Sequence, residues 1–458
     1  MDRKYLKDLI AWMNSEDRKP LLITGARQVG KTYLVKDLFA ETYYKNRYLR
    51  LDCSNETEFV DFVYNNDNLQ NVLDYIDLKY NFKLDKDHLL IIDEAQECLP
   101  IIKMMKHFCE LRRDIPLIVT GSMVRIKLQR TARKRGGFAE GKSFLFPVGK
   151  IDELYVFPLT FDEFLYNVNR HYYDLIKKKY ESKEQVENFE QTEFMDIFYD
   201  YLFVGGMPEA VDAFIKNKDS KSTAYRKAID KIRELYDTYL NDMEMYQASQ
   251  ESIIRSKAIY NNIYKQLAKE NKNFVGSFIQ SDLKTRQLLS PIEWLVTAGI
   301  VNKSYLVKER VTSPLVYDQE SFFRLYLFDM GLFTYQSGLN AATFITGKDN
   351  VMSGVYYENY VATELAARRL KLFYWKGKRD CEMEFLLDIN SRIIPLDSKK
   401  KKGELTSLKE FRNHNKLDVA IKVSANNYGY DSVNKILTLP FYYLPFFLND
   451  IQDYKFDY

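Results

Sequence analysis

The residues best suited to chemistry form a short glycine-rich loop near the start of the chain, Gly-Ala-Arg-Gln-Val-Gly-Lys-Thr at 25–32. Glycines let backbone N–H groups turn toward phosphate oxygens, and a helix N-terminus adds about half a positive charge. Lys31 can reach the β and γ phosphates, and the Thr32 hydroxyl can ligate Mg²⁺. We therefore predict that ATP is bound by Gly25, Ala26, Arg27, Gln28, Val29, Gly30, Lys31 and Thr32.

A pair of carboxylates ends a second apolar segment. Leu-Leu-Ile-Ile at 89–92 is typical of a strand buried on both faces of a parallel sheet, and Asp93 and Glu94 follow it. We expect Asp93 to hold Mg²⁺ together with Thr32, and Glu94 to orient or deprotonate the attacking water. Lys31, Asp93 and Glu94 are then the predicted catalytic residues. The alternative is that the two acidic residues lie on a solvated turn.

A third apolar segment, residues 115–122, ends in hydroxyl side chains. Thr120 or Ser122 could contact the γ-phosphate, because ligands of open α/β sheets bind at the carboxyl ends of the strands. A basic loop is expected after it, with Arg125, Arg130, Arg133 and Arg135. Three roles remain open for this loop: transition-state charge for a neighbouring subunit, contact with nucleic acid, or plain solvation.

These residues require an α/β fold built on the parallel sheet of a P-loop NTPase. A strand at 20–24 precedes the loop and a helical pattern follows it. Residues 187–269 are mostly of helical pattern and predict a helical lid. Helix, turn, helix and strand over 274–306 indicate a winged helix, which could lie in a DNA groove or bind a partner.

The C-terminal part carries a second set of carboxylates. We expect a helix and three strands there, at residues 354–361, 372–375, 382–387 and 392–396. The sequence Asp397-Ser-Lys399 after a strand resembles the nuclease motif of the restriction-endonuclease-like fold. In that reading Glu384 and Asp397 bind Mg²⁺, Lys399 positions or activates water, and Glu358 contributes from the helix. The alternative is a degenerate or purely structural domain.

Several segments together carry a resemblance that none carries alone, and they lie at residues 25–32, 91–96, 120–122, 156–165, 203–210, 266–271, 293–300 and 325–332. The set resembles the AAA-like bacterial and archaeal ATPases that carry a C-terminal domain of unknown function with a restriction-endonuclease-like fold. The resemblance implies ATP binding and hydrolysis, without a known biological task.

Composition limits the remaining classes. The chain has 458 residues, a net charge of +3, 29% charged and 46% apolar residues, as in a globular protein of several domains, so any DNA contact must be local. Its four cysteines are too scattered for a disulfide framework. The longest apolar segments, such as 440–448, are less than half of the roughly 20 residues that cross a bilayer. We expect a cytoplasmic protein without a membrane partner.

The predicted organisation is a P-loop AAA-like ATPase domain, a helical lid region, a winged-helix-like region and a restriction-endonuclease-like α/β domain, at residues 1–170, 171–270, 271–350 and 351–458. The predicted function is Mg²⁺-dependent ATP hydrolysis that moves the C-terminal domains. The alternatives are a DNA-acting nuclease gated by ATP and a nucleotide-dependent binding or regulatory module with little turnover. DNA, a protein partner and a second copy of the chain are the candidate partners besides ATP.

Overall fold

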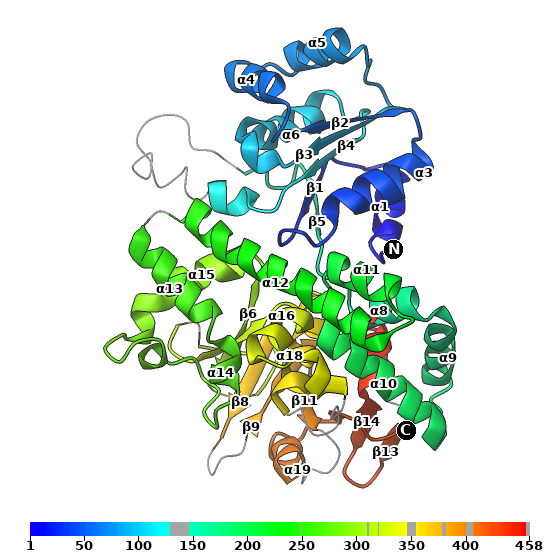
Figure 1. Cartoon of the computed structure of the whole chain (residues 1–458), viewed down its shortest axis with the longest axis vertical. Helices are drawn as coiled ribbons and strands as arrows, with labels where there is room; N and C mark the ends of the chain where they lie inside the picture. The colour runs from blue at the N-terminus through cyan, green and yellow to red at the C-terminus, as the bar shows by residue number, and fades with distance from the viewer. Residues whose placement is uncertain are drawn as a thin grey trace. The chain divides into compact units, whose positions relative to one another are not determined.

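The computed structural model describes residues 1–128, 146–247, 249–308, 311–318, 320–345, 354–377, 382–399 and 406–454 (Figure 1). The chain divides into two compact units, Met1–Phe157 and Pro158–Tyr458, here called unit 1 and unit 2. The boundary falls near the end of the predicted ATPase domain. The finer division of the rest into three domains stays a prediction.

Unit 1 contains a five-stranded parallel sheet in the order β2-β3-β4-β1-β5. Its strands are β1 (Leu21–Thr24), β2 (Tyr48–Asp52), β3 (Leu89–Asp93), β4 (Leu117–Thr120) and β5 (Asp152–Tyr155). The central strands β1, β3 and β4 are buried along their whole length, which explains their uninterrupted apolar sequences. The predicted P-loop NTPase sheet is thus confirmed.

The helices of unit 1 include α1 (Leu6–Met13), α2 (Lys31–Tyr33), α3 (Glu41–Tyr43), α4 (Thr57–Asn65), α5 (Leu69–Tyr80) and α6 (Leu99–Leu111), with the π-helical turn η1 (Leu34–Ala40) and the 3₁₀ turn η2 (Ala95–Glu97). The helix after the glycine-rich loop therefore begins at Lys31 and continues through η1 into α3. On β3, Ile92 packs with Phe59 of α4, Ile76 of α5 and Met105 of α6 in one apolar core. This core fixes the strand end that carries Asp93.

Unit 2 begins with helices, as the sequence predicts. They are α8 (Phe161–Val168), α9 (Arg170–Glu181), α10 (Asn188–Val204), α11 (Pro208–Lys216), α12 (Lys221–Tyr246), α13 (Gln250–Tyr260) and α14 (Ile263–Leu267). The turns η3 (Gly276–Phe278) and η4 (Thr285–Leu288) then lead into α15 (Leu289–Thr297). The second helix of the expected winged helix and the strand after it are present, whereas the first expected helix is only the 3₁₀ turn η3, and the winged helix stays a prediction.

Two mixed sheets complete unit 2. One, in the order β7-β6-β8-β9, contains β6 (Val301–Val307), β7 (Phe323–Leu327), β8 (Leu372–Lys376) and β9 (Glu382–Met383). The other, in the order β10-β11-β12-β14-β13, contains β10 (Phe385–Ile389), β11 (Arg392–Lys399), β12 (Ala420–Ser424), β13 (Gly429–Asp431) and β14 (Ile436–Pro440). Further helical elements of unit 2 are α16 (Met330–Ser337), α18 (Gly354–Ala366), α19 (Thr406–His414), η5 (Phe441–Tyr443) and α20 (Leu444–Asp450).

Two details of these sheets differ from the sequence prediction. The segment 382–387 is not one strand. The extended structure is interrupted at Glu384, and β9 before it and β10 after it belong to different sheets. In addition, β6 pairs in parallel with β8, so a strand of the expected winged-helix region joins a sheet that continues past residue 350. Strand pairing over such a distance is not visible in local periodicity.

Gly25 gives a test of how tightly the loop is held. Its φ is +148°, and a Cβ there would lie 2.2 Å from the Val156 carbonyl oxygen. We expect Gly25→Ala to lower the free energy of unfolding by about 3 kcal/mol, because both backbones must shift. Gly149→Ala is the matched control: its φ is +75° with nothing within 4 Å, so about 1 kcal/mol is expected. Urea unfolding measures both, and equal losses would contradict the prediction.

Candidate functional site

The glycine-rich loop lies between β1 and α2 and turns through left-handed backbone conformations. Gln28 has φ +61° and Gly30 has φ +86°, while Gly25 lies against the Val156 carbonyl. Left-handed residues turn consecutive backbone N–H groups toward one side, which makes an anion-binding concavity. The loop geometry therefore fits a phosphate group.

Lys31 extends from the first turn of α2 back into the loop. Its ammonium donates to the carbonyl of Ala26 at 2.8 Å and to that of Gly25 at 3.2 Å, and the residue is only 5% exposed. Burial lowers the pKa of Lys31 to about 8, although Glu94 and Asp93 partly oppose the shift. A desolvated ammonium inside the loop is a strong counter-charge for phosphate oxygens.

Thr32 and Asp93 meet as the sequence predicts. The Thr32 hydroxyl donates to Oδ2 of Asp93 at 2.9 Å, and the Thr120 hydroxyl donates to Oδ1. Burial alone would raise the pKa of Asp93, but hydrogen bonds from Thr120 and Arg50 hold it below its ordinary value. A hydroxyl and an ionised carboxylate are oxygen donors of the kind that Mg²⁺ prefers, so the residues present fit this ion.

Arg50 belongs to this cluster and was missed in the sequence. From β2 its Nε and Nη2 donate to Oδ2 of Asp93 at 3.0 and 2.7 Å, and Nη2 also reaches Oδ2 of Asp52 at 3.0 Å. The register of β2 and β3 places Asp52 opposite Asp93. No local motif marks Arg50. Only the pairing of the two strands brings it to the site.

Glu94 begins the turn after β3 in a left-handed conformation, with φ +51°. Its N–H donates to Oδ1 of Asp93 at 3.1 Å, and its carboxylate accepts from the Gln96 amide. The other end of that amide, Oε1, is buried and has no hydrogen-bond partner among the described residues. The Gln96 side chain is therefore positioned by Glu94, at the strand end where a water would be oriented.

The remaining predicted contacts of unit 1 are less complete. Thr120 is fully buried and uses its hydroxyl on Asp93, whereas Ser122 is half-buried just past β4, so Ser122 remains the candidate for a γ-phosphate contact. Arg125 forms a 2.5 Å ion pair with Glu153. The other three arginines of the predicted basic loop, Arg130, Arg133 and Arg135, lie outside the described residues.

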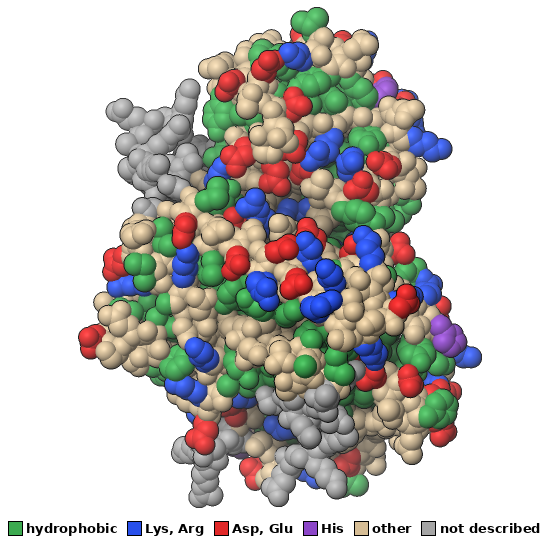
Figure 2. Space-filling view, in the orientation of Figure 1, with side chains coloured by type: hydrophobic (Ala, Val, Ile, Leu, Met, Phe, Trp, Pro, Cys, Tyr) green, Lys and Arg blue, Asp and Glu red, His purple; other side chains and the backbone are tan. Residues whose placement is uncertain are grey.

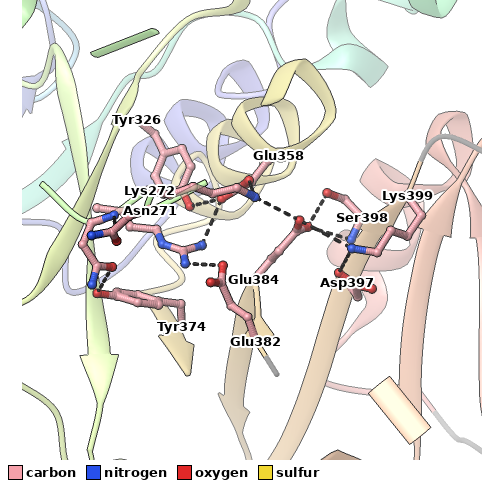
Figure 3. A network of polar contacts seen from close by, with 12 residues as sticks. Asn271, Lys272, Tyr326, Glu358, Tyr374, Glu382, Glu384, Asp397, Ser398 and Lys399 are labelled. Atoms are coloured by element: carbon pink, nitrogen blue, oxygen red, sulfur yellow. Dashed lines mark hydrogen bonds and ion pairs between the residues drawn. The ribbon is translucent and has the colours of Figure 1, made fainter. Parts of the chain in front are cut away.

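In unit 2 the structure brings together Glu358, Glu384, Asp397 and Lys399 (Figure 3). The Lys399 ammonium lies 3.1 Å from Asp397 and 3.9 Å from Glu384, because alternate residues of β11 point to the same face of the sheet. The Ser398 hydroxyl and N–H donate to the Glu384 carboxylate at 2.5 and 2.9 Å. Burial, and next Glu384, raise the pKa of Asp397 to about 7.

Two further cations, Lys272 and Arg324, enter this network and were not predicted. Lys272 contacts Glu358 and lies 3.4 Å from Glu384, so its ammonium sits between two of the proposed metal ligands (Figure 3). Arg324 of β7 is 1% exposed and lies 3.2 Å from Glu358. Burial would raise the pKa of Glu358, but these two cations hold it below its ordinary value.

The predicted magnesium site of the nuclease already contains positive charges. The carboxylates are already neutralised by Lys272, Arg324 and Lys399, and a divalent cation would have to displace an ammonium. Within the described part of the chain, no group of three histidine, cysteine, aspartate or glutamate side chains is arranged to hold a metal ion. Both the nuclease site and its structural alternative stay predictions.

The surface of unit 2 around α11 and α12 carries both signs of charge. Figure 2 shows Lys and Arg side chains interspersed with Asp and Glu there. Ion pairs join Lys216 to Asp212 at 2.6 Å and Lys231 to Glu234 at 2.7 Å. A phosphate backbone is bound by an excess of positive charge, so this face does not favour nucleic acid.

Comparison with known proteins agrees with the site of unit 1. Residues 17–165 match a family model described as an AAA domain. This match supports a P-loop ATPase domain. Residues 195–343 and 353–442 match models described only as domains of unknown function, DUF8612 and DUF4143, so the restriction-endonuclease-like fold stays a prediction. No curated protein matches the chain.

Two solved structures that are similar to this chain have low TM-scores. PCH-2 of C. elegans is 15% identical, with 42% of this chain and 50% of that chain covered and a TM-score of 0.22. AMPPCP-bound DnaA from Aquifex aeolicus is 15% identical, with 64% and 85% covered and a TM-score of 0.27. The chain thus spans half the length of PCH-2, and at these scores neither structure carries weight for function. None of the described helices has the length and apolarity of a membrane span.

Lys272 offers a test of the network in unit 2. We expect Lys272→Met to lower the free energy of unfolding by about 3 kcal/mol, because Glu358 loses one of its two cations while fully buried. Lys269→Met is the control: this lysine is exposed and lies over the Phe278 ring, so less than about 1 kcal/mol is expected. Denaturant unfolding measures both variants. A loss in Lys272→Met as small as in the control would show that the network is not structural.

Proposed function

We propose that this protein is a Mg²⁺-dependent ATP hydrolase whose nucleotide state moves its C-terminal domains. One observation carries the proposal. The Thr32 hydroxyl from the helix start and the Asp93 carboxylate from the strand end are 2.9 Å apart, directly beside the loop that holds the Lys31 ammonium. The phosphate-binding loop, the positive charge of Lys31 and the two proposed magnesium ligands therefore lie next to one another. Hydrolysis of a triphosphate requires this arrangement.

Each residue of the site in unit 1 has a separate role in the proposed hydrolysis. Backbone N–H groups of 25–30 hold the phosphate oxygens, and Lys31 compensates their charge. Bound Mg²⁺ would neutralise charge on the phosphates, with Thr32 and Asp93 as its protein ligands. Glu94, at the open end of β3, orients the attacking water and accepts its proton. Ser122 is positioned to contact the γ-phosphate from the neighbouring strand.

Arg3 supports the proposed link between nucleotide and domain movement. Its guanidinium donates to the Val29 carbonyl in the loop at 2.7 Å and to the Phe157 carbonyl at 2.6 Å. Phe157 is the last residue of unit 1. A change in the loop on hydrolysis is thereby passed to the residue from which the chain enters unit 2. Loss of γ-phosphate contacts commonly releases ordered elements in such switches.

The alternatives have less support. A DNA-cutting function needs a metal site, but Lys272 and Arg324 neutralise the carboxylates of Glu358 and Glu384. The nuclease alternative would be favoured if the protein cleaved DNA in the presence of Mg²⁺ and Lys399→Ala abolished this cleavage. A regulatory module with little turnover shares the nucleotide site and differs only in rate, so measured turnover separates it from the hydrolase.

Steady-state ATP hydrolysis, with and without DNA, tests the proposal. We expect Lys31→Ala to abolish turnover by removing the counter-charge of the phosphates. Glu94→Gln should slow turnover about a hundredfold or more while nucleotide still binds, because an amide cannot accept the proton. The control is Glu97→Gln, a carboxylate of the same turn that pairs with Lys127 at 2.8 Å, which should leave the rate within about twofold. Absence of turnover in the unmodified protein would refute hydrolysis and leave the regulatory module.

A further inference from the structure

We propose that Arg50 is a positioning residue that occupies the Asp93 carboxylate until Mg²⁺ and nucleotide bind, and then withdraws to Asp52. This inference rests on the proposed function, because it concerns the same magnesium ligand. It adds a built-in competition between a guanidinium and a metal ion, which sets how strongly Mg²⁺ promotes nucleotide binding.

The first step is the number of donors on a single oxygen. Oδ2 of Asp93 accepts from the Thr32 hydroxyl at 2.9 Å and from Nε and Nη2 of Arg50 at 3.0 and 2.7 Å. A carboxylate oxygen offers about two lone-pair positions. A water or metal ion can therefore bind this oxygen only if one of the two donor residues leaves it. Thr32 is itself part of the proposed magnesium site, so Arg50 is the residue that must leave.

The second step is which of the partners can move. The Asp93 side chain is 2% exposed and also accepts from Thr120 and the Glu94 N–H, whereas the Arg50 side chain is 28% exposed. The carboxylate is thus held by the sheet, and the guanidinium reaches it from a solvent-accessible position. Arg50 is the partner free to withdraw.

The third step concerns the carboxylate that binds Arg50 after it leaves Asp93. Its Nη2 already lies 3.0 Å from Oδ2 of Asp52. That carboxylate is held in place by the Ser54 N–H at 3.0 Å and the Asn55 amide at 3.1 Å. Asp52 therefore retains the arginine after it leaves Asp93. Repulsion between Mg²⁺ and a guanidinium at the same carboxylate favours that withdrawal.

Binding of AMPPCP, measured by calorimetry in excess Mg²⁺ and in EDTA, tests the proposal without turnover. The relevant quantity is the ratio of the Kd in EDTA to the Kd in Mg²⁺. In Arg50→Gln we expect this ratio to rise about tenfold, because the competing cation is gone. In Asp52→Asn it should fall a few-fold, since Arg50 loses the carboxylate to which it withdraws. Arg50→Lys keeps the positive charge and should stay within about threefold of the unmodified protein.

The control is Arg112→Gln, which removes another arginine paired with an aspartate, Asp114 at 3.0 Å, at a different place in unit 1. Its ratio should not change. The proposal is overturned if Arg50→Gln, folded by circular dichroism, keeps the ratio of the unmodified protein, or if both Kd values rise equally, which would make Arg50 a plain phosphate ligand. A different result would contradict the proposed function: either the unmodified protein does not bind AMPPCP, or Lys31→Ala leaves AMPPCP binding unchanged.

Discussion

The candidate nucleotide site of this protein depends on a buried negative charge at the end of one strand. Asp93 is 1% exposed, and an ionised carboxylate at that depth is tolerated only when hydrogen bonds and positive charge surround it. Thr32, Arg50 and Thr120 supply these contacts from three separate elements. The same carboxylate thereby ties the loop helix to β2 and β4. One carboxylate thus holds three elements together, and it is the same group that we propose as a magnesium ligand.

A similar constraint governs unit 2, with a different outcome. Glu358 is as deeply buried as Asp93, yet it is compensated by Lys272, Arg324 and the Tyr326 hydroxyl, which donates at 2.6 Å. At Asp93 the paired cation is Arg50, whose side chain is 28% exposed. In unit 2 the cations are Arg324, which is fully buried, and Lys272 and Lys399, whose side chains are 21% and 36% exposed. The network of unit 2 therefore contains more cations than the Asp93 site, and one of them has no access to solvent.

The resemblance to AAA-like ATPases and the family match of residues 17–165 agree on unit 1. The structure adds how the site is connected to the rest of the chain. Arg3 joins the loop at Val29 to the end of unit 1 at Phe157, and neither contact is part of the nucleotide motif. The proposed link from phosphate to domain movement can therefore be tested separately from the phosphate site.

The sequence by itself determined the parts of this protein whose signal is local. Spaced glycines with Lys31 and Thr32 define a phosphate loop, and a wholly apolar segment ending in Asp93 defines a buried strand, because both follow from residues adjacent in the chain. Tertiary structure alone decided the partners of these residues. Arg50 reaches Asp93, Lys272 enters between Glu358 and Glu384, and β6 joins β8, all through pairings of distant segments. Strand register and long-range ion pairs depend on how whole helices and strands pack together. The spacing of neighbouring residues in the sequence does not predict this packing.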